Sequence, residues 1–220
     1  LTGSQHLYGP ETLKQVDADS VIIANHLDSH PEMPVKVVFK PVLKSTEEIL
    51  NICKEANHTS NCIGVVIWMH TFSPSKMWIG GLKILQVPLL HLHTQFNRDI
   101  PFADIDMDFM NLNQSAHGDR EMGFMLSRMR MPRKVVVGHW QAASVITQIS
   151  AWSRVAAGRH LMKTMKVVRF GDNMRYVGVT DGDKVSAEIK FGFSVNTHGV
   201  GDLVKVINEI GDAQINALIE

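Results

Sequence analysis

The sequence predicts an α/β protein, with a doubly wound, Rossmann-like parallel sheet followed by the start of a second α/β domain. Stretches with helical periodicity alternate along the chain with short apolar runs of strand length. Those runs are apolar throughout, which is typical of strands buried between two layers of helices in a parallel sheet. The rhythm changes near residue 165, so we expect an N-terminal α/β domain over 1–164 and part of a second domain over 165–220.

Local signals predict the elements of the first domain in chain order. A truncated strand precedes Ser4, and apolar residues at helical spacing after Pro10 predict a helix over 10–29. A capping-box-like sequence that starts at Ser45 predicts a helix that ends near Asn57. Further helices are expected over 75–85, 114–130 and 141–157. Runs of β-branched or apolar residues predict strands over 35–39, 62–69, 88–92 and 134–137.

The second domain is expected to open with strands. Strand-like segments span 165–170, 175–180 and 185–191. The last two are joined by the turn sequence at 181–184, Asp-Gly-Asp-Lys, which is a hairpin signal. A helix is expected over about 200–210. Because the sequence starts without methionine and stops within a helical pattern, we expect it to be part of a longer protein.

Composition excludes several classes of function. The 220 residues contain 45% apolar and 20% charged side chains, and 22 basic residues balance 22 acidic ones. A formal charge of zero predicts no nucleic-acid partner and no anionic membrane surface as a partner. The two cysteines are too few for a disulfide framework and match no zinc spacing, which favours a reducing cytoplasm. No apolar run approaches the roughly 18 residues of a membrane span.

The polar segments that follow the expected strands are the candidate site. In an open α/β sheet, ligands bind past the carboxyl ends of the strands. Such segments lie at 4–8, 70–76 and 91–97. Each could also be purely structural, and Ser73 or Ser75 is expected to cap the helix that follows.

Two histidines suggest a metal site. His91 and His93 are spaced to point to the same side of a strand, as in metal-dependent hydrolases. Further ligands would be needed, and a structural role is the alternative. The run 104–108 opens like a calcium loop, but Phe109 replaces the required glycine and Ser115 the required glutamate, so calcium is excluded. A dinucleotide site is not expected, because no glycine-rich fingerprint follows a strand.

The segment 106–120 is rich in amides. It places several side chains that both donate and accept hydrogen bonds within about two turns, namely Asn111, Asn113, Gln114 and His117. Such groups bind sugar hydroxyls well because they offer both functions without a fixed charge. Helix capping by Asn113 or Gln114, with His117 in the core, is the structural alternative.

Several blocks in the right order resemble one family, the L-arabinose isomerases. The resemblance extends over the whole chain, and any single block would be weak support. The blocks are GSQHLYGPETL (3–13), HTFSPSKMWIGGL (70–82), HTQFNRDIP (93–101), IDMDFMNLNQSAHGDRE (105–121), RFGDNMR (169–175) and TDGDKVSAEIKFGFSVN (180–196).

The resemblance implies an aldose–ketose isomerase of arabinose catabolism. The enzymes it resembles convert L-arabinose to L-ribulose, and D-galactose to D-tagatose, with a divalent cation that is usually Mn²⁺. In that family, two glutamates and two histidines hold the metal and do the chemistry, and they lie beyond position 220. The resemblance therefore implies no catalytic or metal-binding residue in this chain. It also implies a cytoplasmic homo-oligomer, a hexamer in this family.

The resemblance assigns substrate contacts to this chain. In the oligomer these residues close over the active site of a neighbouring subunit. They are Gln5, Leu7, Phe72, Gln114, His117 and Met174. Two other functions stay open, namely a sugar-binding module without catalysis and a metal-dependent hydrolase that uses His91 and His93.

Overall fold

The computed structural model describes residues 1–72 and 74–219. The chain divides into two compact units, Leu1–Ala157 and Gly158–Glu220. Among the described residues, we find no helix with both the length and the apolar character needed to cross a bilayer.

The first unit is built on a parallel sheet of four strands in the order β1-β2-β3-β4. The strands are β1 (Thr2–Gly3), β2 (Val65–Met69), β3 (Leu89–His93) and β4 (Lys134–Val137). A parallel bridge between Gly3 and Leu43 continues this order on the other side of β1. After β1 the chain passes Leu43 on one side of β1, and it then returns to form β2 on the other side of β1. The order reverses between β1 and β2, which is the switch point where open α/β sheets bind ligands.

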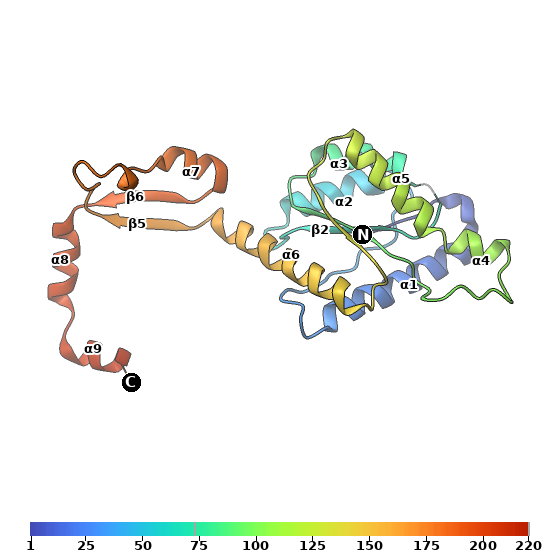
Figure 1. Cartoon of the computed structure of the whole chain (residues 1–220), viewed down its shortest axis with the longest axis horizontal. Helices are drawn as coiled ribbons and strands as arrows, with labels where there is room; N and C mark the ends of the chain where they lie inside the picture. The colour runs from blue at the N-terminus through green and yellow to red at the C-terminus, as the bar shows by residue number, and fades with distance from the viewer. Residues whose placement is uncertain (73, 220) are drawn as a thin grey trace. The chain divides into compact units, whose positions relative to one another are not determined.

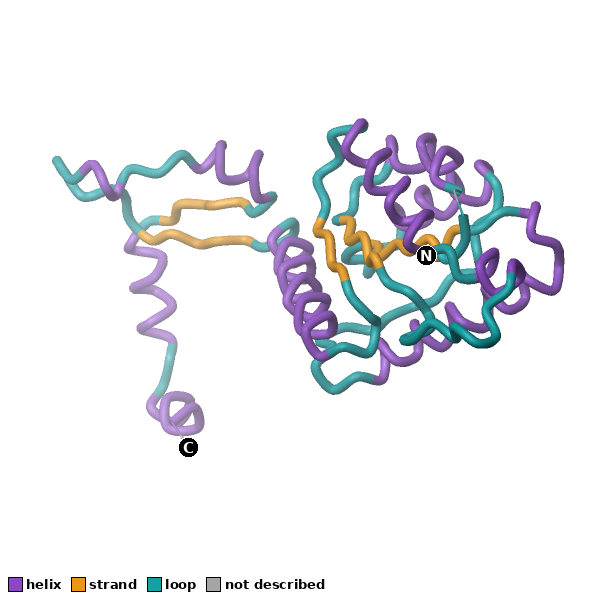
Figure 2. Tube along the Cα trace, turned by 45° about the vertical axis from the view of Figure 1, so that its right-hand side comes forward, coloured by secondary structure: helices purple, strands orange, loops and turns teal. Residues whose placement is uncertain are grey.

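Helices cover both faces of this sheet, as Figures 1 and 2 show. Helices α2 (Thr46–His58), α3 (Ile79–Ile84) and α5 (Ser115–Arg128) enclose one core, which contains Ile49, Ile67, Leu82 and Met122. Helices α1 (Gly9–Ser29) and α6 (Ala143–Met162) enclose the other core, which contains Ile23, Trp68, Leu90 and Ile146. The alternation of Ile67 and Trp68 between the two cores follows from the two-residue period of a strand. The predicted doubly wound sheet is confirmed.

Local signals predicted the helices well. In α2, the Ser45 hydroxyl accepts from the backbone N–H of Glu48, and the Glu48 carboxylate accepts from the N–H of Ser45, at 3.2 and 3.1 Å. This is the predicted capping box, which satisfies two donors at the helix start. Pro10 lies in the first turn of α1, as expected. The helix expected over 75–85 divides into a 3-10 turn, η2 (Ser75–Trp78), and α3.

The strand expected over 35–39 is wrong, because this segment has no ladder. β1 begins only at Thr2, and its one partner on this side is Leu43, whose N–H donates to Thr2 O at 2.9 Å. Residues Val35–Val38 instead line a cavity of about 530 Å³ at the amino edge of the sheet. β-branched residues favour a strand only where a neighbour accepts and donates the ladder hydrogen bonds.

The second unit contains a parallel pair, β5 (Lys166–Phe170) and β6 (Ser194–His198), which are paired throughout their length. A 3-10 turn, η3 (Gly178–Thr180), and α7 (Lys184–Phe191) lie between them. Helices α8 (Val200–Glu209) and α9 (Asp212–Ile219) follow. The predicted strand at 165–170 and the helix near 200–210 are confirmed.

Two strand predictions and the hairpin are wrong in this unit. Residues 175–180 form turns and η3, and 185–191 lie in α7. The Asp183 carboxylate accepts from the N–H of Ser186 at 2.8 Å, so the presumed turn residue caps a helix. Gly192 ends α7 with a φ of 92° and leads into β6. The unit is a strand–helix–strand crossover, which joins parallel strands, instead of an antiparallel hairpin.

Candidate functional site

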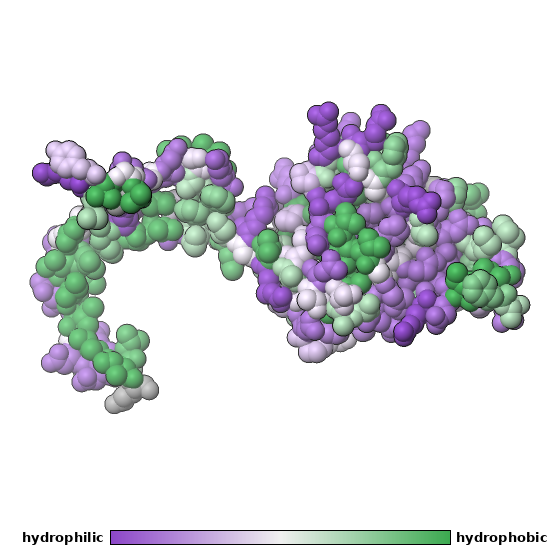
Figure 3. Space-filling model, in the orientation of Figure 1, coloured by the Kyte–Doolittle hydropathy of each residue, from purple (hydrophilic) through white to green (hydrophobic). Residues whose placement is uncertain are grey.

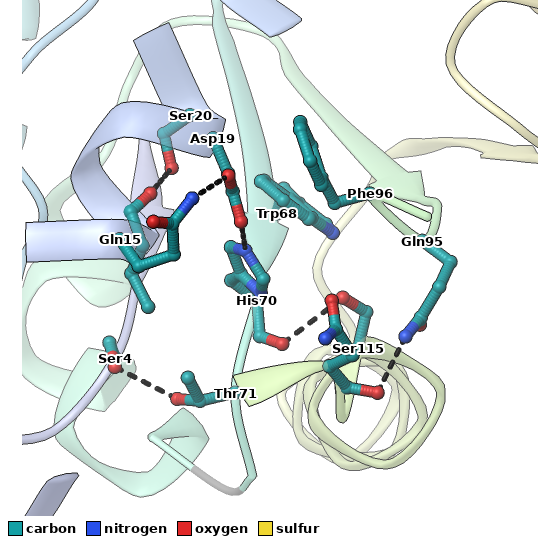
Figure 4. A network of polar contacts seen from close by, with 12 residues as sticks. Ser4, Gln15, Asp19, Ser20, Trp68, His70, Thr71, Gln95, Phe96 and Ser115 are labelled. Carbon is teal, nitrogen blue, oxygen red and sulfur yellow. Dashed lines mark hydrogen bonds and ion pairs between the residues drawn. The ribbon is translucent and has the colours of Figure 1, made fainter. Parts of the chain in front are cut away.

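The loops after β1 and β2 are tied together at the switch point. The hydroxyls of Ser4 and Thr71 are buried and lie 2.9 Å apart (Figure 4). The Gln5 side-chain amide donates to Phe72 O at 3.1 Å, and the Tyr8 hydroxyl donates to the same oxygen at 3.2 Å. The first loop is therefore held against the second by its polar side chains.

The first turn of α5 lies on the second loop. The Ser115 hydroxyl donates to His70 O at 3.2 Å (Figure 4). The Ser75 hydroxyl donates to Gly118 O at 3.3 Å and so joins η2 to α5. The expectation that Ser75 caps the helix that follows is therefore wrong. Ser73 lies outside the described residues. A Cβ added to Gly118 would lie 2.3 Å from Thr71 O, so only glycine allows this approach.

Replacing Gly118 by alanine is therefore expected to destabilise the first unit by about 1–3 kcal/mol, because a backbone oxygen cannot move aside as a flexible side chain can. Urea unfolding followed by circular dichroism measures this change. Gly80→Ala is the matched control, because a Cβ at this helical glycine would meet no atom within 4 Å. Equal midpoints for the two variants would contradict this account.

Phe72 and His117 form a stack at the surface. Their ring centroids are 4.1 Å apart, and the ring planes meet at 28°. Phe72 is 42% exposed, and His117 is also exposed. His117 is therefore not the core histidine of the structural alternative. The pair presents aromatic surface at the switch point.

Gln114 begins α5 but does not cap it with its side chain. Its backbone carbonyl accepts from the N–H groups of His117 and Gly118, both at 3.0 Å. The Asn113 carbonyl accepts from the side-chain amide of Gln95 at 2.5 Å, which joins the amide-rich segment to the loop after β3. The half-buried Gln114 side chain is therefore not needed to start the helix.

Two predicted substrate-contacting residues, Leu7 and Met174, lie outside the Phe72–His117 stack. Leu7 lies in the 3-10 turn η1 (His6–Tyr8), two residues after Gln5, and is 81% exposed. Met174 is 66% exposed in the second unit, between β5 and η3. The structure thus brings Gln5, Phe72 and His117 together by direct contacts, whereas Met174 belongs to the other unit.

Comparison with known sequences decides the family. Residues 1–164 match the pattern described as the L-arabinose isomerase N-terminal domain, and residues 166–220 match the pattern described as its central domain. The chain belongs to the L-arabinose isomerase family. The expected domain boundary after residue 164 stays a prediction, since the compact units divide within α6.

Individual relatives are similar along the whole chain. L-arabinose isomerases from Herpetosiphon aurantiacus and Geobacillus thermodenitrificans are 61% and 58% identical over 220 residues. The one from Koribacter versatilis is 60% identical over 219 residues. The chain spans 44% of the length of each of these L-arabinose isomerases, and each alignment covers all of this chain.

His91 and His93 do share one side of β3, as their spacing predicts. Their rings are stacked with centroids 6.0 Å apart. His91 Nε2 lies 2.9 Å from Asp119 Oδ1, and both residues are buried. Burial lowers the pKa of His91 to about 4 and raises the pKa of Asp119 well above its ordinary value. Burial thus favours the neutral form of each group, so the contact is a core hydrogen bond and not an ion pair.

His91 and His93 have no third candidate metal ligand grouped with them among the described residues. Over residues 1–72 and 74–219, no three histidine, cysteine, aspartate or glutamate side chains are grouped as metal ligands. Asp119, the carboxylate nearest His91, also accepts from the backbone N–H of Met69 at 2.9 Å. Both contacts are made by Asp119 Oδ1 within the core, and no metal-dependent step is assigned to these groups.

A crevice of about 300 Å³ adjoins the site at the carboxyl ends of β3 and β4. The residues that line it include His93, Gln95, Asn97, Arg98, Ala116 and His139. Ala116 lies between Gln114 and His117 in α5, so the crevice continues the surface that carries the stack.

Sequence reasoning missed a buried pair next to the site. His70 Nε2 donates to Asp19 Oδ2 at 2.8 Å, from β2's carboxyl end to α1 (Figure 4). A signal was available in α1: Asp19 lies on the same helical stripe as the buried Val16, Ile23 and Leu27. A carboxylate on an apolar stripe requires a buried partner. The sequence alone does not say which residue supplies it.

Proposed function

We propose that this chain supplies the sugar-contacting surface of an L-arabinose isomerase, which interconverts L-arabinose and L-ribulose, and D-galactose and D-tagatose, in arabinose catabolism. The observation that carries the proposal is the open stack of Phe72 and His117 at the switch point, in a chain of this family. Gln5 contacts this stack through Phe72, and Gln114 lies one helical turn before His117. The surface combines aromatic faces with groups that donate and accept.

Each side chain has a role that fits its chemistry. The exposed Phe72 ring packs against the C–H groups of a sugar, and Leu7 adds apolar contact. Gln5 and Gln114 hydrogen-bond the hydroxyls through their amides. His117 holds a hydroxyl or the oxygen of the opened chain. The substrate contact that the resemblance assigns to Met174, which lies in the second unit, stays a prediction.

We place the Mn²⁺ ion of the reaction outside this chain. The described residues offer no group of three ligands, and the resemblance puts the metal-binding glutamates and histidines beyond position 220. The role of this chain is therefore to bind and orient the sugar and to exclude water. The relatives are more than twice as long as this chain, which leaves room for the catalytic groups.

We further propose a homo-oligomer in which this surface closes over a neighbouring subunit's active site. Exposed apolar side chains cluster on α4 (Met107–Leu112) and the loop before it, directly ahead of Gln114. They are Ile100, Phe102, Ile105, Met107 and Met110. Figure 3 shows an apolar patch over this part of the unit. Contiguous exposed apolar surface of this kind supports a protein contact.

Mixing two variants of the complete enzyme, each with lowered activity, tests the shared site. One variant carries His117→Ala, and the other lacks a metal ligand. Subunit exchange is expected to restore activity, because one mixed site receives an intact His117 from one chain and intact ligands from the other. Absence of recovery, with exchange verified by mass spectrometry, would argue for sites within one chain.

A cytoplasmic location is part of the proposal. Both cysteines are free, with Cys53 buried and Cys62 half-buried. Burial raises the pKa of the Cys53 thiol to about 11, which suppresses the reactive thiolate. Free thiols of this kind are typical of a reducing compartment.

A further inference from the structure

A buried polar pair lies directly before the loop that carries Phe72. His70 and Asp19 are 0% and 1% exposed, and their side chains are joined at 2.8 Å. The side-chain amide of Gln15 donates to the second Asp19 oxygen at 2.7 Å. The His70 ring is stacked on Trp68, with centroids 4.6 Å apart, and faces Phe96 at 6.3 Å. Figure 4 shows these side chains converging from α1, β2 and the loop after β3.

Stability alone does not explain this pair. A buried charged or polar pair is often no more stable than apolar residues of the same volume. The second ring nitrogen of His70, Nδ1, has no hydrogen-bond partner among the described residues. An unsatisfied buried nitrogen lowers stability further. What a hydrogen-bonded pair adds over apolar packing is orientation, because the bond fixes the rotation of the ring.

The backbone of His70 connects the elements that form the site. Its N–H donates to Gly3 O in β1 at 3.4 Å, and its carbonyl accepts from the Ser115 hydroxyl at 3.2 Å. Phe72 follows His70 by two residues, and His117 follows Ser115 by two residues. A shift of His70 therefore displaces both members of the stack at once.

We propose that the Asp19–His70 pair is a positioning device that aligns Phe72 and His117 for sugar binding. The hydrogen bond from α1 fixes the imidazole, and the fixed residue holds the start of the second loop and the first turn of α5. Asp19 and His70 act through other residues and touch no substrate themselves. The sugar part of this inference rests on the function proposed above, whereas the alignment of the stack does not.

Nuclear magnetic resonance of this chain tests the alignment without any activity. A His117 ring stacked on Phe72 has proton shifts displaced by the aromatic ring current. His70→Leu and Asp19→Leu are expected to move these shifts to the values of an exposed histidine. His70→Gln, whose amide still donates toward Asp19, is expected to restore most of the displacement.

Asn57→Ala is the matched control. It removes two hydrogen bonds at the opposite edge of the sheet, a part-buried one to Ile84 O at 2.7 Å and an exposed one from Gln86 N at 2.8 Å. It is expected to lower the midpoint of unfolding and to leave the His117 shifts unchanged. Unchanged His117 shifts in a folded His70→Leu protein would overturn the proposal.

Kinetics of the complete enzyme then separate positioning from the proposed function. We expect His70→Leu to raise KM for L-arabinose and to lower kcat/KM about tenfold or more, because small misplacements of contact groups are costly. Asn57→Ala is expected to change neither value. Displaced His117 shifts with unaltered kinetics would support the alignment role and overturn the sugar-contacting function.

Discussion

No turnover of L-arabinose is expected from the chain of residues 1–220, even with Mn²⁺ at saturating concentration. Moving hydrogen between C1 and C2 puts negative charge on the sugar oxygens, and a bound metal and a proton-transferring carboxylate are needed to stabilise and relay it. No three ligands come together within 1–72 and 74–219, and Asp119 is held in the core. Chromatographic measurement of ketose formation provides the test.

The complete enzyme under the same conditions is the positive control for this experiment. Ketose formation by the pure 220-residue chain, at a rate that depends on Mn²⁺, would show that the catalytic groups lie within these residues. The proposal that they lie beyond position 220 would then be wrong.

In the complete enzyme, His117→Ala should lower kcat/KM for L-arabinose roughly 5-fold to 150-fold. Losing a well-placed hydrogen bond in a buried site costs about 1–3 kcal/mol. In the function proposed above, His117 holds a sugar oxygen and does not bind metal, in keeping with the neutral hydrogen-bonding residues Asn113 and Gln114 that precede it. Its alanine variant also loses the ring that stacks on Phe72.

Two further measurements complete this test. The affinity for Mn²⁺ is expected to be unchanged in His117→Ala, and a collapse of that affinity together with activity would identify His117 as a ligand or a ligand's partner. His58→Ala is the control for loss of an exposed histidine, because His58 ends α2 and bonds only to Lys54 O within the described contacts. Its kinetics are expected to match those of the unaltered enzyme.

Most of the fold was predictable because its signals are local. The capping box at Ser45 and Glu48 acts within one turn, and the apolar run of β2 is long enough to specify a buried strand. The failures share a cause. Residues 35–39 have strand-forming side chains but no neighbouring strand to pair with. Residues 185–191 fit the periodicity of a helix or of a strand, and the Asp183 cap selects the helix.

For the candidate site, too, the local features were predictable from the sequence and the long-range contacts were not. Local chemistry, together with the family resemblance, identified the residue types, namely amides, a histidine and an aromatic residue in segments that follow strands. Their proximity was beyond the reach of sequence reasoning. Gln5 reaches Phe72 because β1 and β2 are neighbours, and Phe72 meets His117 because Gly118 lets α5 approach Thr71.

The sequence by itself determined the alternation of helices and strands, the burial of the apolar runs and the chemistry offered at the strand ends. Each of these follows from interactions among residues close in the chain. Only the tertiary structure decided that Asp19 would find His70, 51 residues away, and that 35–39 would stay unpaired. Long-range partners depend on which strands become neighbours, and that order results from packing the whole sheet between its helices.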